Sequence, residues 1–255
     1  MIDWAWRIPF LFSCVLVAVG VFVRLKLTEA PIFLAVLDES KSKTLPMMEV
    51  MVNHFKPFFL GILICISGYV LFYIMIAFSQ IYAKSAPIIS EAGYVMGLGF
   101  SPQIFTALLM FSSVSLAITI TISGKYIDKV GRRIWLIWTT VGVALFGLAL
   151  PYFLKNGTTV SLFWFLITGM GLIGMGYGPL SSFLPELFPT HVRYTGSSLT
   201  YNIAGLFGAS VAAIIALPLN ANYGLKGVGI YLTLNAILSL IGLWFIEETR
   251  DRQLL

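Results

Sequence analysis

GKYIDKVGRR, the stretch from Gly124 to Arg133, sets one acidic and four basic residues between two long apolar runs. Charges are rare in this chain, because only 11% of the 255 residues are charged while 58% are hydrophobic. A charged side chain is costly in the hydrocarbon core of a bilayer and is favoured at its surface. The stretch therefore predicts a short loop at a membrane surface, between two spanning helices.

Several apolar runs along the chain have the length of spanning helices. The mean hydropathy is +0.92, and a helix needs about 20 apolar residues to cross a bilayer. The period-two alternation of membrane-spanning strands is not seen. We therefore expect an all-α multispanning membrane protein with about seven transmembrane helices. The expected spans are residues 8–25, 57–80, 102–123, 134–153, 160–183, 197–218 and 228–246.

The basic residues predict the orientation of these spans. If the spans alternate in direction, twelve of the sixteen lysines and arginines fall on one side. Lysine and arginine are enriched in cytoplasmic loops, so this side, which holds residues 26–56, residues 124–133 and the C-terminus, is expected to be cytoplasmic. The expected location is the plasma (inner) membrane. The net charge of +5 is then explained by these loops, and no nucleic-acid partner is expected.

The residue types that enzymes need are scarce. His54 and His191 are expected to be isolated residues in loops, so neither a metal site nor a catalytic cluster is predicted. Cys14 and Cys65 lie in apolar runs and are interpreted as packing residues. The chain has no phosphate-binding glycine–lysine motif, and its last expected span has no lysine that would hold a retinal. We predict that the protein is not an enzyme.

The stretch GKYIDKVGRR resembles the loop signature of the major facilitator superfamily, G-x-x-x-D-(K/R)-x-G-R-(R/K). Other segments are similar to the metabolite–proton symporter branch of that superfamily. These segments are WRIPFLFS (6–13), LTEAPIF (27–33), LPELFPTHVRYTGSSLTYNIAGLFG (184–208) and EETRDR (247–252).

The resemblance implies that this chain holds spans six to twelve of a twelve-span fold, and lacks spans one to five. Residues 1–25 are then the last span of the N-terminal half, residues 26–56 a central cytoplasmic loop, and residues 57–255 the C-terminal six-helix half. The implied function is secondary active transport of a small organic acid or zwitterion, with the proton as coupling ion and no other cofactor. The alternatives are a truncated inactive product, or half of a split transporter whose partner chain supplies spans one to five.

Polar and aromatic residues inside the spans are candidates for a substrate cavity. Buried tyrosines also serve as ordinary packing residues, and a buried asparagine also joins helices by hydrogen bonds, so both interpretations stay open. The cavity candidates are Tyr69, Phe72, Tyr73, Tyr201 and Asn202.

Charged residues near the cytoplasmic surface are expected to form an ion-pair network that closes an inner gate. In the signature, Gly124 is expected to let two helix ends approach, Gly131 to form a tight turn, and Asp128 to lie at a helix end or against its own arginines. The alternative is a set of exposed pairs, each worth about 0–1 kcal/mol. The network candidates are Asp128, Arg132, Arg133, Glu186, Arg193, and either Glu247 or Glu248.

Glycines crowd one expected span and are followed by a proline. Such a segment either packs closely against a neighbour or bends during the transport cycle. The expected neighbour is the helix that carries Gly205 and Gly208. The residues concerned are Gly169, Gly171, Gly174, Gly176, Gly178 and Pro179.

The eleven acidic residues all lie outside the expected span interiors. Proton coupling usually needs an ionisable group inside the membrane. The resemblance therefore implies that the coupling groups lie in the absent first half, and that this chain alone does not drive proton-coupled uptake.

Overall fold

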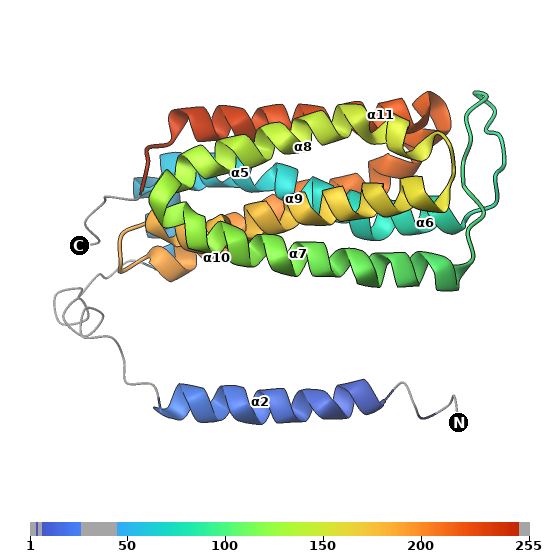
Figure 1. Cartoon of the computed structure of the whole chain (residues 1–255). Helices are drawn as coiled ribbons and strands as arrows, with labels where there is room; N and C mark the ends of the chain where they lie inside the picture. The colour runs from blue at the N-terminus through green and yellow to red at the C-terminus, as the bar shows by residue number, and fades with distance from the viewer. Residues whose placement is uncertain (1–3, 5–6, 27–44, 250–255) are drawn as a thin grey trace. The chain divides into compact units, whose positions relative to one another are not determined.

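The computed structural model describes residue 4, residues 7–26 and residues 45–249 (Figure 1). The chain divides into two units, Met1–Lys43 and Thr44–Leu255. In the first unit, helix α2 covers Ile8–Lys26 and is apolar from Phe10 to Val23. All of its described side chains are exposed. This helix matches the expected first span.

The second unit is a bundle of long helices with a short helix before them. The helix α4 covers Pro46–Asn53, α5 covers Phe55–Tyr73, and a π-helical turn, Ile74–Phe78, joins α5 to α6, Ser79–Lys84. The next helices are α7, Pro102–Val130; α8, Arg132–Leu154; and α9, Thr159–Glu186. The last are α10, Arg193–Gly205, a π-helical turn, Leu206–Ser210, and α11, Val211–Phe245.

The run Arg193–Phe245 supplies two passages across a membrane. A straight helix of its 53 residues would be about 80 Å long, against a hydrocarbon core of about 30 Å. The run breaks at Gly224, whose φ of 65° and ψ of −168° are not helical. In Figure 1 the chain runs out along α10 and returns along the red end of α11. These two passages correspond to the expected spans 197–218 and 228–246.

The described residues confirm the expected fold class. Five helical runs are long and apolar enough to cross a membrane, and α2 is a shorter apolar helix. The core between them is made of large aliphatic and aromatic side chains. Phe165 and Phe183 from α9, Leu150 from α8 and Leu232 from α11 are fully buried.

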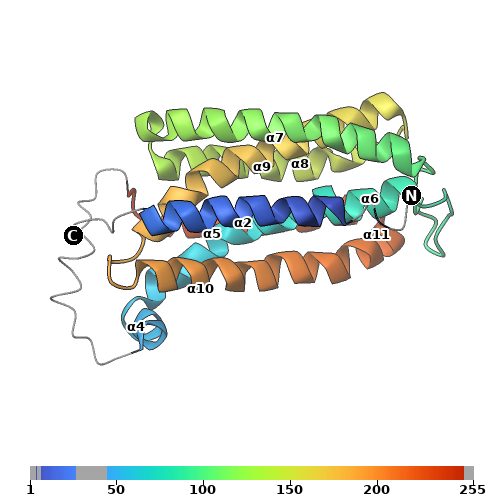
Figure 2. The same cartoon turned by 90° about the horizontal axis from the view of Figure 1, so that it is seen from below.

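Gly171, Gly174 and Gly178 of α9 pack against α7, which lies alongside α9 in Figure 2. A Cβ added at Gly174 would lie 2.6 Å from the main-chain oxygen of Leu116, and one added at Gly178 would overlap the Ser123 hydroxyl. Gly176 is roomier, since its nearest neighbour would be Thr139 at 3.8 Å. The α9 helix continues through Pro179 to Glu186.

The expected neighbour of these glycines was wrong. Gly205 and Gly208 pack against α5 instead, where an added Cβ at Gly208 would lie 2.7 Å from Cβ of Tyr69. The spacing of small residues defines which face of a helix is narrow, but it does not say which helix fills that face.

Two expected loops are helical where the structure describes them. The stretch 124–133 is not an open loop, because α7 continues to Val130 and α8 begins at Arg132. Only Gly131 separates them. Its φ of 99° is one that residues other than glycine rarely adopt. Within the expected loop 26–56, residues 27–44 lie outside the described residues, and the remainder forms α4 and the start of α5. Pro46 suits the first turn of α4, which needs no N–H donor there.

Candidate functional site

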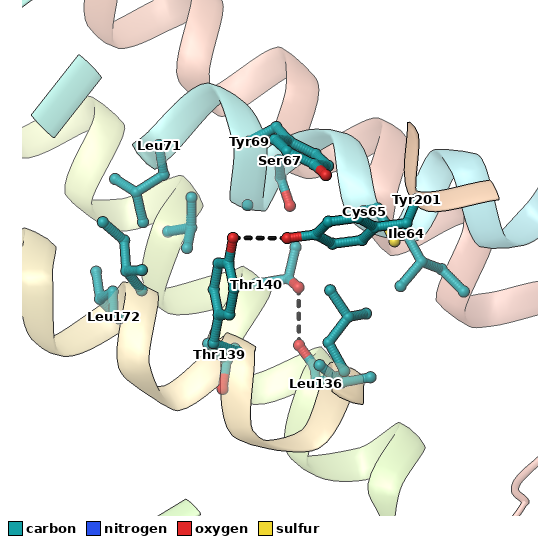
Figure 3. A pocket seen from close by; sticks show the side chains of 16 residues that line it. Ile64, Cys65, Ser67, Tyr69, Leu71, Leu136, Thr139, Thr140, Leu172 and Tyr201 are labelled. Atoms are coloured by element: carbon teal, nitrogen blue, oxygen red, sulfur yellow. Dashed lines mark hydrogen bonds between the residues drawn. The ribbon is translucent and has the colours of Figure 1, made fainter. Parts of the chain in front are cut away.

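A pocket lies between α5, α8, α9 and α10 (Figure 3). Its walls are aliphatic side chains together with Cys65, Ser67, Thr139, Thr140 and three tyrosines. The two threonine hydroxyls donate to main-chain oxygens of their own helix, at 3.0 and 2.8 Å. No charged side chain is among the described residues that line this pocket. Its volume of about 50 Å³ is enough for a few water molecules.

Three tyrosines give the pocket most of its polar character. The hydroxyls of Tyr177 on α9 and Tyr201 on α10 are 2.6 Å apart and share a hydrogen bond. The ring of Tyr69 on α5 lies 4.9 Å from the ring of Tyr201, at an angle of 49°. Tyr69 is held in place because Gly205 and Gly208 leave room for its side chain. The three rings thus come from three helices and meet at one end of the pocket.

A second, more open pocket adjoins the first one between α9 and α10. Its volume is about 330 Å³, and Tyr177, Leu180 and Tyr201 line both pockets. Its other walls include Pro185 and Tyr194, which lie where α9 ends and α10 begins. The hydrogen-bonded pair Tyr177–Tyr201 therefore stands between the inner pocket and this outer groove.

The structure separates the predicted cavity residues. Tyr69 and Tyr201 line the inner pocket, whereas Phe72 and Tyr73 do not. Asn202 is exposed, and its amide donates to the main-chain oxygen of Ser198 at 2.8 Å. Tyr177 was missed from the sequence because its glycine-rich surroundings were interpreted only as a packing or bending segment. The available signal was that Tyr177 is an aromatic residue on a different face of the helix from Gly171, Gly174 and Gly178.

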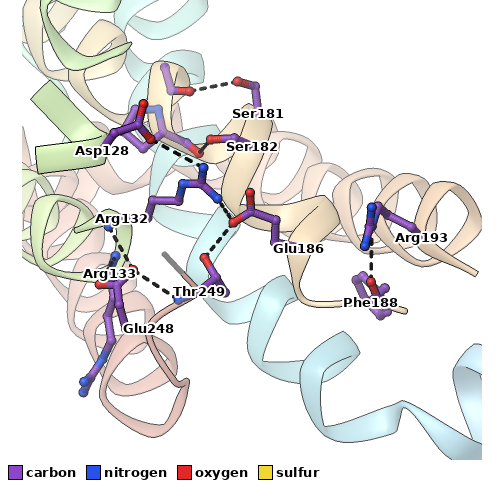
Figure 4. Close-up of polar contacts among 12 residues, drawn as sticks. Asp128, Arg132, Arg133, Ser181, Ser182, Glu186, Phe188, Arg193, Glu248 and Thr249 are labelled. Atoms are coloured by element: carbon purple, nitrogen blue, oxygen red, sulfur yellow. Dashed lines mark hydrogen bonds and ion pairs between the residues drawn. The ribbon is translucent and has the colours of Figure 1, made fainter. Parts of the chain in front are cut away.

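A polar network lies at the end of the bundle where α7 passes into α8 (Figure 4). We call this the Gly131 end. Arg132 forms an ion pair with Glu186 at the end of α9, and a longer one, 3.5 Å, with Asp128. The side chains of Arg132 and Glu186 are only 17% and 12% exposed, while that of Asp128 is 73% exposed. The hydroxyl of Thr249 donates to Glu186 at 2.8 Å.

Glu248 binds the N-terminal end of α8. Its two carboxylate oxygens accept the main-chain N–H groups of Arg132 and Arg133, each at 3.0 Å. These donors have no partner within their own helix, and the helix dipole favours an anion there. A Cβ on Gly131 would lie 2.9 Å from a carboxylate oxygen of Glu248. A glycine is therefore favoured here for two reasons: the positive φ of the turn, and the room that Glu248 needs to approach.

Arg133 binds the C-terminal end of α11. Its guanidinium donates to the main-chain oxygens of Leu243 at 2.7 Å and Trp244 at 3.0 Å. Carbonyl groups at the end of a helix lack partners in the helix, and a cation suits them. Arg132, Arg133 and Glu248 together connect α7, α8, α9 and the end of α11.

Other predicted members of the network lie elsewhere. Arg193 does not meet an acid among the described residues; it donates to the main-chain oxygen of Phe188 and to the hydroxyl of Thr190. Glu247 is exposed and makes no ion pair with the described residues, so Glu248 takes the place expected of either acid. The reason is that the chain leaves α11 at Phe245 in an extended form, in which adjacent side chains point to opposite sides.

Gly124 and Asp128 occupy the exposed side of α7. An added Cβ on Gly124 would meet no atom within 4 Å, so the close approach expected there is not made within the described residues. Asp128 lies against the Arg132 of its own signature, four residues further on and across the break at Gly131.

The expectation that the two histidines are isolated was wrong. His191 lies in the turn between α9 and α10, and its Nε2 is 2.7 Å from a carboxylate oxygen of Glu49 on α4. The ring of His54 is 6.5 Å from that of His191. The metal-ligating atoms of Glu49, His54 and His191 all lie within 4.8 Å of one another.

Comparison with known proteins shows what this chain is similar to. Residues 1–213 match the family model of the Major Facilitator Superfamily. The chain is 81% identical over 254 residues to a candidate metabolite transport protein of Haemophilus influenzae, a match that covers 100% of this chain and 57% of that protein. It is 39% identical over 253 residues to the inner membrane metabolite transport protein YhjE of Escherichia coli, covering 99% and 56%. It is 25% identical over 264 residues to a proline/betaine transporter of Salmonella typhimurium, covering 99% and 50%.

The chain spans 50–57% of the length of these curated relatives. No solved structure matches it.

Proposed function

Because the chain belongs to the Major Facilitator Superfamily, we propose that it is the larger part of a secondary transporter for a small organic acid or zwitterion, coupled to protons. The observation that carries this proposal is the tyrosine-lined pocket at the meeting of α5, α8, α9 and α10. Transporters built of related halves bind their substrate near the membrane midplane, between the halves. The chain supplies one wall of such a site.

The chemistry of the pocket suits a substrate with a carboxylate. The hydroxyls of Tyr69, Tyr177 and Tyr201 are hydrogen-bond donors in an otherwise apolar wall, and a carboxylate accepts such bonds well. The face of a tyrosine ring also attracts an ammonium group. Both features fit the two substrate classes, and one of the relatives is named as a proline/betaine transporter.

The Tyr177–Tyr201 pair is proposed to close the pocket toward the Gly131 end. The pair lies between the inner pocket and the outer groove, and the network of Arg132, Glu186 and Glu248 holds the helices together at the same end. We place this end, and with it the C-terminus, in the cytoplasm of a cell with an inner membrane. The basic residues support this placement, because cytoplasmic ends are enriched in lysine and arginine. The signature alone brings four of them to the Gly131 end, whereas the opposite ends of the helices have Lys84, Lys155 and Lys226.

The rest of the transporter is proposed to pack against α7. Ser113, Ala117, Thr121 and Gly124 follow one another at spacings of four, four and three residues, so they share one face, and all four are exposed. Small residues on an exposed face let a second membrane helix approach closely. Spans one to five, from the same protein or from a partner chain, are proposed to supply that helix and the ionisable groups for proton coupling. An inactive truncated product remains the alternative.

Transport by reconstituted protein tests this proposal. The chain is placed in liposomes alone, or together with the part of the Haemophilus relative that it does not match, and uptake of labelled betaine, proline and a set of organic acids is measured under a proton gradient. We expect gradient-dependent uptake only from the combination. Strong uptake by the chain alone would reject the need for a second part. A combination that assembles but carries none of these solutes would reject the transport function and favour the inactive product.

A further inference from the structure

We propose that Glu49, His54 and His191 form a Zn²⁺ site at the Gly131 end of the bundle. Two imidazoles and one carboxylate are a ligand set that Zn²⁺ accepts, with a water molecule in the fourth position. The three ligating atoms already lie within 4.8 Å of one another. The residues all belong to the second unit, so the site does not depend on any other part of a transporter.

His191 is held by a turn with buried residues on both sides. The N–H of Val192 donates to the main-chain oxygen of Pro189 at 3.2 Å, which closes a turn with His191 at its third position. Phe188 and Val192 on either side are buried. Arg193 supports the same turn through its bonds to Phe188 and Thr190. The backbone that carries the imidazole is thus held in place before any metal binds.

Glu49 and His54 come from the opposite side, at α4 and its junction with α5. The N–H of His54 donates to the oxygen of Val50, and the oxygen of His54 accepts the N–H of Phe58, both at 3.1 Å. The side chain of Val50 is fully buried, which anchors α4 on the bundle, and α4 packs against α10. Glu49 and His54 on one side, and His191 on the other, therefore belong to segments that are far apart in sequence but packed together.

The present geometry is close to that of a tetrahedral zinc site. Bonds of about 2.0–2.1 Å in a tetrahedron place ligand atoms about 3.3 Å apart. The distance between His191 Nε2 and Glu49 Oε1 is 2.7 Å, as a hydrogen bond, and all three ligating atoms lie within 4.8 Å of one another. Rotation of side chains by about 1–1.5 Å at their tips reaches the zinc geometry. The metal then replaces the proton shared by His191 and Glu49.

Zinc fits this site better than the harder cations do. Mg²⁺ and Ca²⁺ take six or more oxygen ligands, whereas two of these three ligands are nitrogens. The side chains of His191 and Glu49 are 34% and 15% exposed, which leaves a path for a hydrated ion and a place for the fourth ligand. Bound zinc would join the segment that leads into α5 to the turn between α9 and α10.

Zinc binding by the purified chain tests the site. The 255-residue chain, made without a histidine tag, is stripped with a chelator in detergent and titrated with Zn²⁺ and, in parallel, Co²⁺. We expect one ion per chain, and for Co²⁺ the strong visible absorption of a tetrahedral site. His54→Ala, His191→Ala and Glu49→Gln should each weaken binding by about tenfold or more. The matched control is Glu91→Gln, an exposed acid in the loop between α6 and α7, which should bind as the unaltered chain does.

Three results would overturn the proposal. These are no zinc retained by the unaltered chain, equal binding in all the variants, and a Co²⁺ spectrum typical of six oxygen ligands. Helical content from circular dichroism shows whether each variant is folded, so that weaker binding is not confused with unfolding. Zinc binding and solute uptake are separate measurements, and failure of one leaves the other standing.

Discussion

The guanidinium of Arg132 and the carboxylate of Glu186 form an ion pair that joins the start of α8 to the end of α9. Both side chains are mostly buried. Loss of one member of a buried pair costs up to about 3–5 kcal/mol, whereas exposed pairs are worth about 0–1 kcal/mol. The burial of this pair places it nearer to the first case.

Glu186→Gln should therefore destabilise the bundle by about 2–3 kcal/mol, because it leaves Arg132 without its nearest anion. Asp128→Asn is the control, since its pair with Arg132 is longer and exposed, and it should cost less than about 1 kcal/mol. The measurement is the free energy of unfolding in mixed detergent micelles. Equal effects of the two substitutions would show that burial does not set the strength of these pairs.

Gly131→Ala should destabilise the protein by about 1–3 kcal/mol, because it combines a positive φ with a contact of 2.9 Å to Glu248. Gly124→Ala lies in open space within the helical α7 and should be neutral, or stabilising by up to about 1 kcal/mol. Unfolding of the two variants, measured side by side, tests this. A Gly131→Ala protein as stable as the parent would mean that Glu248 does not occupy the described position.

Gly174→Ala should destabilise the contact between α7 and α9 by about 1–3 kcal/mol, because the methyl group meets the backbone of Leu116, which cannot move aside easily. Gly176→Ala, two residues further on, has 3.8 Å of room and should be tolerated. Thermal unfolding followed by circular dichroism compares them. If Gly176→Ala proved the more harmful, the assignment of the narrow face of α9 would be wrong.

Gly124→Leu should leave the stability of the chain alone unchanged but weaken its association with the complementary part of the transporter. The reason is that a large side chain would stand on the small-residue face of α7. Co-purification from detergent measures the association, with Leu145→Ala on α8, an exposed residue outside that face, as the control. Undiminished co-purification would contradict the docking of a helix on α7.

Tyr201→Phe should lower uptake by the reconstituted combination roughly two- to tenfold, because it removes the hydroxyl shared with Tyr177 and one donor to the solute. Tyr152→Phe is the matched control, since Tyr152 is highly exposed on α8 and distant from the pocket-lining residues of that helix. Initial rates at several solute concentrations distinguish weaker binding from slower transport. Unchanged kinetics in Tyr201→Phe would remove this residue from the proposed pathway.

The sequence was sufficient for the long apolar helices and for part of the pocket, but not for α4 or for the continuation of α7 to Val130. Apolar runs of the length of a bilayer gave the fold class, and aromatic residues within them gave Tyr69 and Tyr201. The partner of each residue was harder to predict. Glu248 rather than Glu247 reaches α8 because the chain is extended after Phe245. No sequence pattern near these residues predicts that backbone conformation. His54 and His191 meet only because α4 packs against α10, a contact between segments that are remote in sequence.

The single residue between α7 and α8 has a mechanical consequence. A connection of one residue has almost no slack, so α7 cannot tilt or slide without carrying the start of α8 with it. Glu248 and Arg133 then pass that displacement to the end of α11, since each is bonded to main-chain atoms of the other's segment. We therefore expect α7, α8 and the end of α11 to move together, with the change in direction at Gly131. A force applied to the exposed face of α7 is therefore delivered to the far side of the bundle.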